Sequence, residues 1–132
     1  YSPLQMASDM IENYENNPAF DFITSCPTNW AKTVVPEAKI GEYVTIARKD
    51  RDSENWFIGS ITNASPREVN LPLSFLDANA SYKAHIFADG EEANYKNNPY
   101  PVTITEENVN SSTVLTLKQA PGGGTAIMII KE

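Results

Sequence analysis

The spacing of apolar and polar residues changes along the chain, from a helical period near the start to a period of two beyond Tyr43. In residues 1–14, apolar side chains recur at the spacing of one helix face and polar side chains fill the other. Ser2, Pro3 and Gln5 supply the N-cap, the first-turn proline and the capping-box residue. The apolar face contains Leu4, Met6, Ala7, Met10, Ile11 and Tyr14. We therefore expect an amphipathic helix over residues 1–14 that packs against another structure.

A second, shorter helix is predicted to follow, with Asn17 as its N-cap and Pro18 at its first position. It should end before Pro27, because the residue that precedes a proline avoids the helical conformation. Trp30 comes next, and we expect its large side chain to fill the junction between this helical arm and the remaining chain.

From Tyr43 onward, the alternation indicates about seven short strands that are separated by turn residues. Residues 43–49 and 56–62 flank a charged loop and predict a hairpin. Residues 68–75 alternate cleanly, but Pro72 has no N–H to donate, so this strand should lie at a sheet edge. The other predicted strands are 82–88, 101–106, 113–119 and 125–131. The last of them is apolar on both sides, which favours a central position.

Antiparallel strands with one solvated face need a second layer to cover the other face. The predicted fold is therefore mainly β: an antiparallel two-sheet β-sandwich that follows a short N-terminal helical arm. A length of 132 residues suits a single compact unit. Within it, we expect residues 1–32 to form the helical arm and residues 33–132 to form the sandwich.

Charge narrows the possible partners. The net charge is −7, and the ten Lys and Arg residues are scattered, which argues against nucleic acid or an anionic membrane as a partner. No segment approaches the ~20 consecutive apolar residues of a membrane-spanning helix. Cys26 is the single cysteine, so an internal disulfide is impossible.

Residues with catalytic or metal-binding chemistry are few and isolated. His85 has no second His or Cys nearby, and we expect it to be exposed or paired across strands. Acidic residues cluster at 50–54 and 89–92, but neither loop has the EF-hand spacing, and solvated loop tips are the favoured interpretation over a calcium site. Residues 121–126 lack the Lys-Ser/Thr pair of a phosphate loop and precede a strand, so they predict a turn. No residue is assigned a catalytic or metal-binding role.

Three aromatic residues near predicted loops could stack on sugar rings. Trp56 begins a strand and is expected in the core. Tyr95 and Tyr100 are the better candidates for sugar binding, although the surrounding Asn and Pro residues are also ordinary turn formers.

Several stretches in order resemble the C-terminal end of glycoside hydrolase family 97. They are "YSPLQMASDMIENYENNPAFDFI", "CPTNW", "GEYVTIARK", "WFIGSIT", "LPLSFL", "YKAHIFADG" and "GGGTAIMI". The family contains bacterial α-glucosidases and α-galactosidases with an N-terminal β-domain, a catalytic (β/α)8 barrel and a C-terminal sandwich. The resemblance implies that residues 1–14 form the last barrel helix and that their apolar face normally packs on the barrel.

The resemblance implies a non-catalytic accessory domain that supports the catalytic barrel. The catalytic glutamates and the calcium ligands of the family belong to the barrel, so no such residue is transferred to this chain, and this chain alone should be inactive. A periplasmic or cell-surface location in a Gram-negative bacterium is implied in the same way. The alternatives are a carbohydrate-binding module that uses Tyr95 and Tyr100 on an oligosaccharide, or a free-standing interaction domain. An exposed apolar face on the 1–14 helix would also favour self-association.

Overall fold

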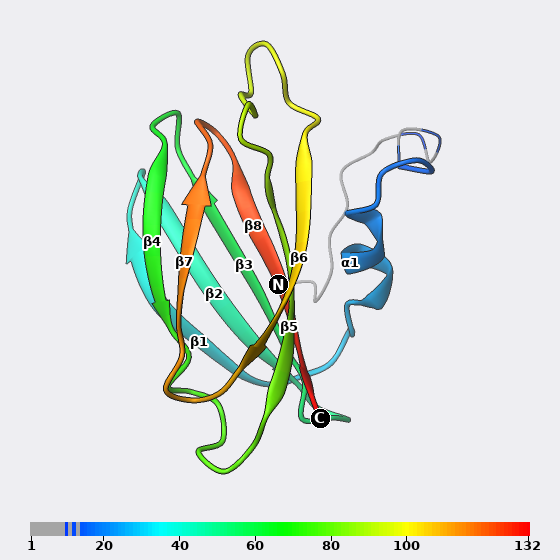
Figure 1. Cartoon of the computed structure of the whole chain (residues 1–132), viewed down its shortest axis with the longest axis vertical. Helices are drawn as coiled ribbons and strands as arrows, with labels where there is room; N and C mark the ends of the chain where they lie inside the picture. Colours follow the sequence, from blue (N-terminus) through cyan, green and yellow to red (C-terminus); the bar gives the residue numbers. More distant parts are fainter. Residues whose placement is uncertain (1–9, 11, 13) are drawn as a thin grey trace.

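The computed structural model of the chain describes residues 10, 12 and 14–132 (Figure 1). Most of the predicted helix over residues 1–14, and self-association through its apolar face, lie outside the described residues. The described part contains one short helix and eight strands.

The short helix α1 spans Phe20–Ser25 and starts later than the sequence suggested. Asn17 Oδ1 accepts a hydrogen bond from the Ala19 N–H at 3.0 Å, and the Asn17 carbonyl accepts one from the Phe20 N–H at 2.9 Å. The capping chemistry of Asn17 is therefore used in a turn just before the α-helix. The helix ends at Ser25, and the backbone of Cys26 is extended, as expected for the residue before Pro27.

Two antiparallel sheets form the sandwich. The large sheet has the order β1-β2-β3-β8-β5-β6, and the small sheet pairs β4 with β7. The strands are β1 Trp30–Lys39, β2 Tyr43–Asp50, β3 Trp56–Thr62, β4 Arg67–Pro72, β5 Tyr82–Asp89, β6 Val102–Val109, β7 Val114–Gln119 and β8 Gly124–Lys131. The predicted mainly β sandwich, the β2–β3 hairpin, the edge position of β4 and the central position of β8 are all confirmed.

β1 is the strand that the sequence pattern missed. It carries Pro36, and its pairing with β2 shifts register between Trp30 and Lys32 and again between Val34 and Glu37. These irregularities interrupt the alternation of apolar and polar residues that identifies a strand. The predicted division of the chain between residues 32 and 33 falls inside β1.

The hydrophobic core lies between the two sheets. Val69, Leu71, Leu115 and Leu117 point from the small sheet toward the large one, where Trp56, Ile58, Ala84, Ile127 and Ile129 meet them. Trp56 is 3% exposed and stacks at a tilt on Phe75, which confirms its predicted core position. Residues facing the core alternate with residues facing away from it along β3, β5 and β8, so the large sheet has a second, outer face.

Candidate interaction surface

The outer face of the large sheet is unusually apolar for a sheet that already covers a core on its other side. Register places Phe57 opposite Met128, Gly59 opposite Ala126, and Phe87 opposite Ile104. The apolar residues of this outer face are Val44, Ile46, Phe57, Ile61, Phe87, Val102, Ile104, Ala126 and Met128. Antiparallel sheets normally present polar side chains on a face that meets water, so this composition indicates a face made for contact.

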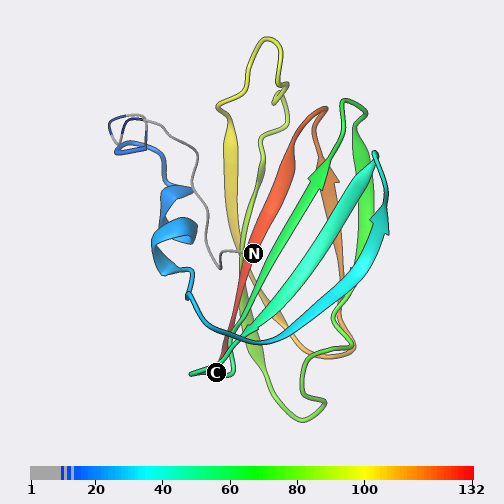
Figure 2. The same ribbon diagram turned by 180° about the vertical axis from the view of Figure 1, so that it is seen from behind.

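Helix α1 covers the centre of the outer face, on the side of the large sheet opposite β4 and β7 (Figures 1 and 2). The Phe22 ring meets Phe57 and Phe87 edge-on, with both centroid distances at 6.0 Å. Trp30 also meets Phe57 edge-on at 5.8 Å, and its predicted role at the junction after the helix stays a prediction. Together these contacts leave Phe57 7% exposed and Phe87 8% exposed.

Beyond α1, the outer face remains open to solvent. Ile61 is 62% exposed, Val102 36% and Ile104 42%. A shallow hollow of about 360 Å³ lies between α1 and the sheet, and its lining includes Phe22, Ile23, Ile61 and Val102. The bare apolar surface therefore continues from the edge of the helix toward β6.

Partial burial changes the acidity of Cys26, the residue directly after α1. Burial raises the pKa of the Cys26 thiol, and the positive charge of Arg48 opposes this shift to a smaller extent. The Arg48 guanidinium lies 5.7 Å from the centre of the Trp30 ring, in a cation–π contact. A thiol with a raised pKa is a poor nucleophile at neutral pH, so Cys26 has the character of a packing residue.

The two tyrosines predicted to bind sugar lie on the loop between β5 and β6, which extends beyond the other loops at that end (Figure 1). Tyr95 is 48% exposed, with Lys96 Nζ 5.6 Å from its ring centre and the Gly122 backbone packed against the ring. Tyr100 is 85% exposed. No ring contact joins the two tyrosines in the described part of the chain. Sugar binding by this pair stays a prediction.

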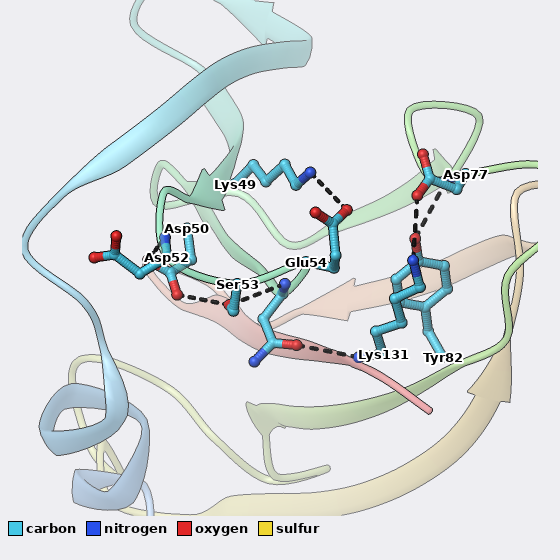
Figure 3. Close-up of polar contacts among 9 residues, drawn as sticks. Lys49, Asp50, Asp52, Ser53, Glu54, Asp77, Tyr82 and Lys131 are labelled. Carbon is cyan, nitrogen blue, oxygen red and sulfur yellow. Dashed lines mark hydrogen bonds and ion pairs between the residues drawn. The ribbon is translucent and has the colours of Figure 1, made fainter.

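Two acidic side chains of the 50–54 cluster, between β2 and β3, accept hydrogen bonds from neighbouring residues (Figure 3). Asp50 accepts hydrogen bonds from the Asp52 N–H and from the Ser53 hydroxyl, at 3.2 and 2.6 Å. Glu54 accepts one from Lys49 Nζ at 2.7 Å, and this bond raises the pKa of Lys49. Nearby, Lys131 Nζ lies 3.6 Å from Asp77.

Asp89 and His85, which were considered for metal binding, also bond to other residues of the fold. Asp89 Oδ2 accepts hydrogen bonds from the Ala120 and Gly124 N–H groups, at 2.8 and 2.9 Å. His85 Nδ1 lies 3.2 Å from Glu106 Oε1, directly across the β5–β6 pair, which confirms the predicted cross-strand pairing. Residues 121–123 form the predicted turn, and β8 begins directly after it at Gly124.

The described residues contain neither a helix suited to crossing a membrane nor a group of three or more His, Cys, Asp and Glu side chains placed to hold a metal. What the structure brings together is an aromatic contact made by Phe22, Phe57 and Phe87, from three separate elements. The consecutive apolar residues of β3, Trp56 to Ile58, indicate cover on both faces of that strand, but they do not identify Phe22 as the residue that supplies it.

The fold and this outer face define an antiparallel β-sandwich with an apolar margin that is open to solvent. Residues 29–130 match the protein family described as "Glycosyl-hydrolase 97 C-terminal, oligomerisation". The chain is also 35% identical over 134 residues to the retaining alpha-galactosidase of Bacteroides thetaiotaomicron. The chain therefore belongs to glycoside hydrolase family 97, as a C-terminal domain of that family.

Solved structures of family 97 enzymes also match this chain. The glycoside hydrolase family 97 enzyme from Pseudoalteromonas sp. strain K8, in complex with panose and in complex with acarbose, matches the whole chain with a TM-score of 0.94 and 40% identity. The match to the Bacteroides relative covers 97% of this chain and 19% of the relative. The match to the Pseudoalteromonas enzyme covers 100% of this chain and 21% of the enzyme. It thus spans about a fifth of the length of these relatives.

Proposed function

We propose that the chain serves as a non-catalytic accessory domain that packs against the catalytic domain of a family 97 glycosidase and stabilises it. The observation that carries this proposal is the apolar outer face, which α1 covers only in part and which leaves Ile61 62% exposed. Burying such a side chain in an interface contributes about 1.5–3 kcal/mol. The parent enzyme would hydrolyse α-glucosidic or α-galactosidic bonds, in line with the relatives.

The remaining expectations about the parent follow from the same family. Calcium, where the enzyme uses it, would bind in the catalytic domain. The enzyme would act in the periplasm or at the cell surface of a Gram-negative bacterium. Localisation of the tagged full-length enzyme by cell fractionation tests the second point, and a purely cytoplasmic product would contradict it.

The docking role is tested with Ile61→Asp in the full-length enzyme and in the 132-residue chain. We expect a lower Tm in the full-length enzyme, because the new carboxylate is buried against the catalytic domain, and little change in the chain alone, where position 61 meets water. Val114→Asp is the matched control, since Val114 is 57% exposed on the small sheet, away from the outer face. Equal effects of both substitutions in the full-length enzyme would contradict docking through the outer face.

The non-catalytic role is tested with nitrophenyl α-glucoside and nitrophenyl α-galactoside. The purified chain should release no nitrophenol above the uncatalysed rate. Hydrolysis that depends on carboxylates of the chain, such as Asp89 or Glu106, would overturn the proposal.

A second candidate function, sugar binding, is favoured only by the 85% exposed ring of Tyr100. Titration of the chain with maltooligosaccharides by calorimetry, with Tyr100→Ala as the comparison, decides it. Binding that is lost in the variant would favour a carbohydrate-binding module, and the absence of heat would dismiss it.

A further inference from the structure

The four edge strands of the sandwich differ in how they are protected against pairing with another chain. An unprotected edge offers a row of free N–H and C=O groups, which proteins usually block with prolines, bulges or charges. β1 contains Pro36 and two register shifts. β4 ends in Pro72. β6 and β7 contain neither proline nor register shift within their pairings.

Backbone alternation shows that Pro72 blocks the outer side of β4. The Leu73 N–H donates to the Thr113 carbonyl at 3.0 Å, so Leu73, Leu71 and Val69 direct their backbone groups toward β7. Pro72 therefore faces away from β7, where its missing N–H leaves a gap in the outer edge. The β1 and β4 edges are both protected.

The same rule identifies the free groups of β6. The Gly90 N–H donates to the Pro101 carbonyl at 2.9 Å, next to the Asp89–Val102 pair. Residues 103, 105 and 107 consequently bond toward β5, whereas Val102, Ile104, Glu106 and Asn108 direct their N–H and C=O groups to the free edge. Every side chain from Val102 to Asn108 is exposed, so the β6 edge is open along its length.

The β7 edge is less accessible to a large partner. The N–H of Ala120, directly after β7, already donates to Asp89 on β5. Its remaining length opens into a hollow of about 610 Å³, whose floor includes Ile86, Thr103 and Thr105 from the large sheet. A hollow of this size suits a small molecule or a few residues of chain, not a second folded sandwich.

We propose that β6 pairs antiparallel with β6 of a second copy of this chain, so that the two large sheets join into one continuous sheet. The partner is a second copy because the description of the matching family includes oligomerisation. In addition, a two-fold axis brings identical edges together. The proposal goes beyond the proposed accessory function, by naming the surface through which copies associate.

Residue chemistry along β6 fits this pairing. Val102, Thr103, Ile104 and Thr105 are strong strand formers. With Ile104 opposite the partner's Ile104, each Glu106 lies opposite the partner's Val102, so like charges never face each other directly. The exposed Val102 and Ile104 side chains would then cover their counterparts on the outer face. Since the β1 and β4 edges are blocked, the assembly stops at two copies and does not extend into a fibre.

The test measures the mass of the 132-residue chain by sedimentation equilibrium over a concentration series, alone and with substitutions. Ile104→Lys places two ammonium groups opposite each other, and Ile104→Pro removes only the N–H that faces the free edge. We expect either change to raise the dimer dissociation constant roughly tenfold or more, because edge hydrogen bonds and apolar contacts are lost. Ile61→Asp, on the outer face but away from the edge, and Thr116→Pro, at the β7 edge, are the controls and should leave it unchanged.

Amide hydrogen exchange by NMR supplies a second readout that does not depend on the variants. The Ile104 and Glu106 amides should become protected as the concentration rises, whereas the Thr103 and Thr105 amides bond to β5 and should be protected at every concentration. A wild-type chain that stays monomeric, or a dimer that is unaffected by Ile104→Lys and shows no new protection at Ile104, would overturn the proposal. A dimer that Ile61→Asp alone disrupts would also overturn the β6 interface, but it would leave the accessory role intact.

Discussion

At the residue scale, the glycines have different physical reasons to be glycine. Gly122 has φ +69°, and a Cβ there would lie 2.9 Å from Cδ1 of Tyr95. Gly41 has φ +77° but open space around its Cα. Gly59 lacks a positive φ, and a Cβ added to it would meet no atom within 4 Å. A side chain would therefore meet both backbone strain and a steric conflict at Gly122, backbone strain alone at Gly41, and neither at Gly59.

Substitution by alanine should follow that order. Gly59→Ala should change the free energy of unfolding by less than about 0.5 kcal/mol. Gly41→Ala should cost about 1 kcal/mol because of the left-handed backbone conformation. Gly122→Ala should cost about 2–3 kcal/mol, because the Tyr95 ring must also move. Urea unfolding measures all three, and equal values for Gly41→Ala and Gly122→Ala would show that Tyr95 yields without cost.

The Cys26 thiol gives a prediction about pH. Because burial raises its pKa, the thiolate should form at higher pH in the folded chain than in the chain unfolded in urea. The rate of iodoacetamide alkylation at pH 8 should accordingly be lower in the folded chain, with its titration midpoint at higher pH. Arg48→Ala should raise that midpoint further, since the guanidinium favours the thiolate. A folded-state midpoint at or below the unfolded one would contradict this account.

At the scale of elements, two contacts join parts that are distant in the sequence. Asp89, at the end of β5, accepts hydrogen bonds from the Ala120 and Gly124 N–H groups and so fixes the turn between β7 and β8. Phe22 attaches α1 to β3 and β5 through Phe57 and Phe87. Each contact connects a segment to the large sheet in a way that strand pairing does not provide.

Removal of the Asp89 carboxylate should destabilise the fold. Asp89→Ala leaves two N–H groups without their acceptor, and we expect a loss of about 1–3 kcal/mol in the free energy of unfolding. Asp89→Asn retains one carbonyl oxygen and should lose less. Asp52→Ala, in the exposed loop between β2 and β3, is the control and should have little effect. Thermal and urea unfolding compare the three, and an Asp89→Ala chain as stable as the control would contradict the capping role.

Removal of the Phe22 ring should release α1 from the outer face. We expect Phe22→Ala to cost about 1–3 kcal/mol, less than a fully buried phenylalanine, because the site is half-buried. Phe57 and Phe87 would become exposed, so binding of the dye ANS should rise. Thr24→Ala, on the exposed side of the same helix, is the control. Unchanged dye binding in Phe22→Ala would mean that α1 stays attached without that ring.

Sequence patterns predicted those elements whose local signals are regular. β8 could be placed at the centre because Ala126 and Met128 are apolar on one side and Ile127 and Ile129 on the other. β1 was not predictable, because its bulges and Pro36 interrupt the alternation. The aromatic contact of Phe22 with Phe57 and Phe87 was not predictable either, since it depends on how α1 crosses the sheet. Tyr95 had a sugar-stacking interpretation in the sequence, but only the structure showed the Gly122 backbone against its ring.

At the scale of the whole molecule, the two sides of the large sheet have different tasks. The inner face holds the core against β4 and β7, and the outer face carries α1 and an open apolar margin. The protected edges lie on β1 and β4, and the open edge lies on β6. The proposed docking on a catalytic domain would thus use the outer face, and the proposed pairing with a second copy would use the β6 edge. Substitutions at Ile61 and Ile104 should therefore affect different associations.

The central place of β8 also decides when the domain can fold during translation. β3 and β5 lie on either side of β8 and have no pairing with each other, so among the described strands only Gly124–Lys131 hydrogen-bonds the halves β1–β3 and β5–β6 into one sheet. Until those residues have emerged from the ribosome, the two halves cannot join into the large sheet. A stop codon before Gly124 would therefore abolish the domain instead of trimming it.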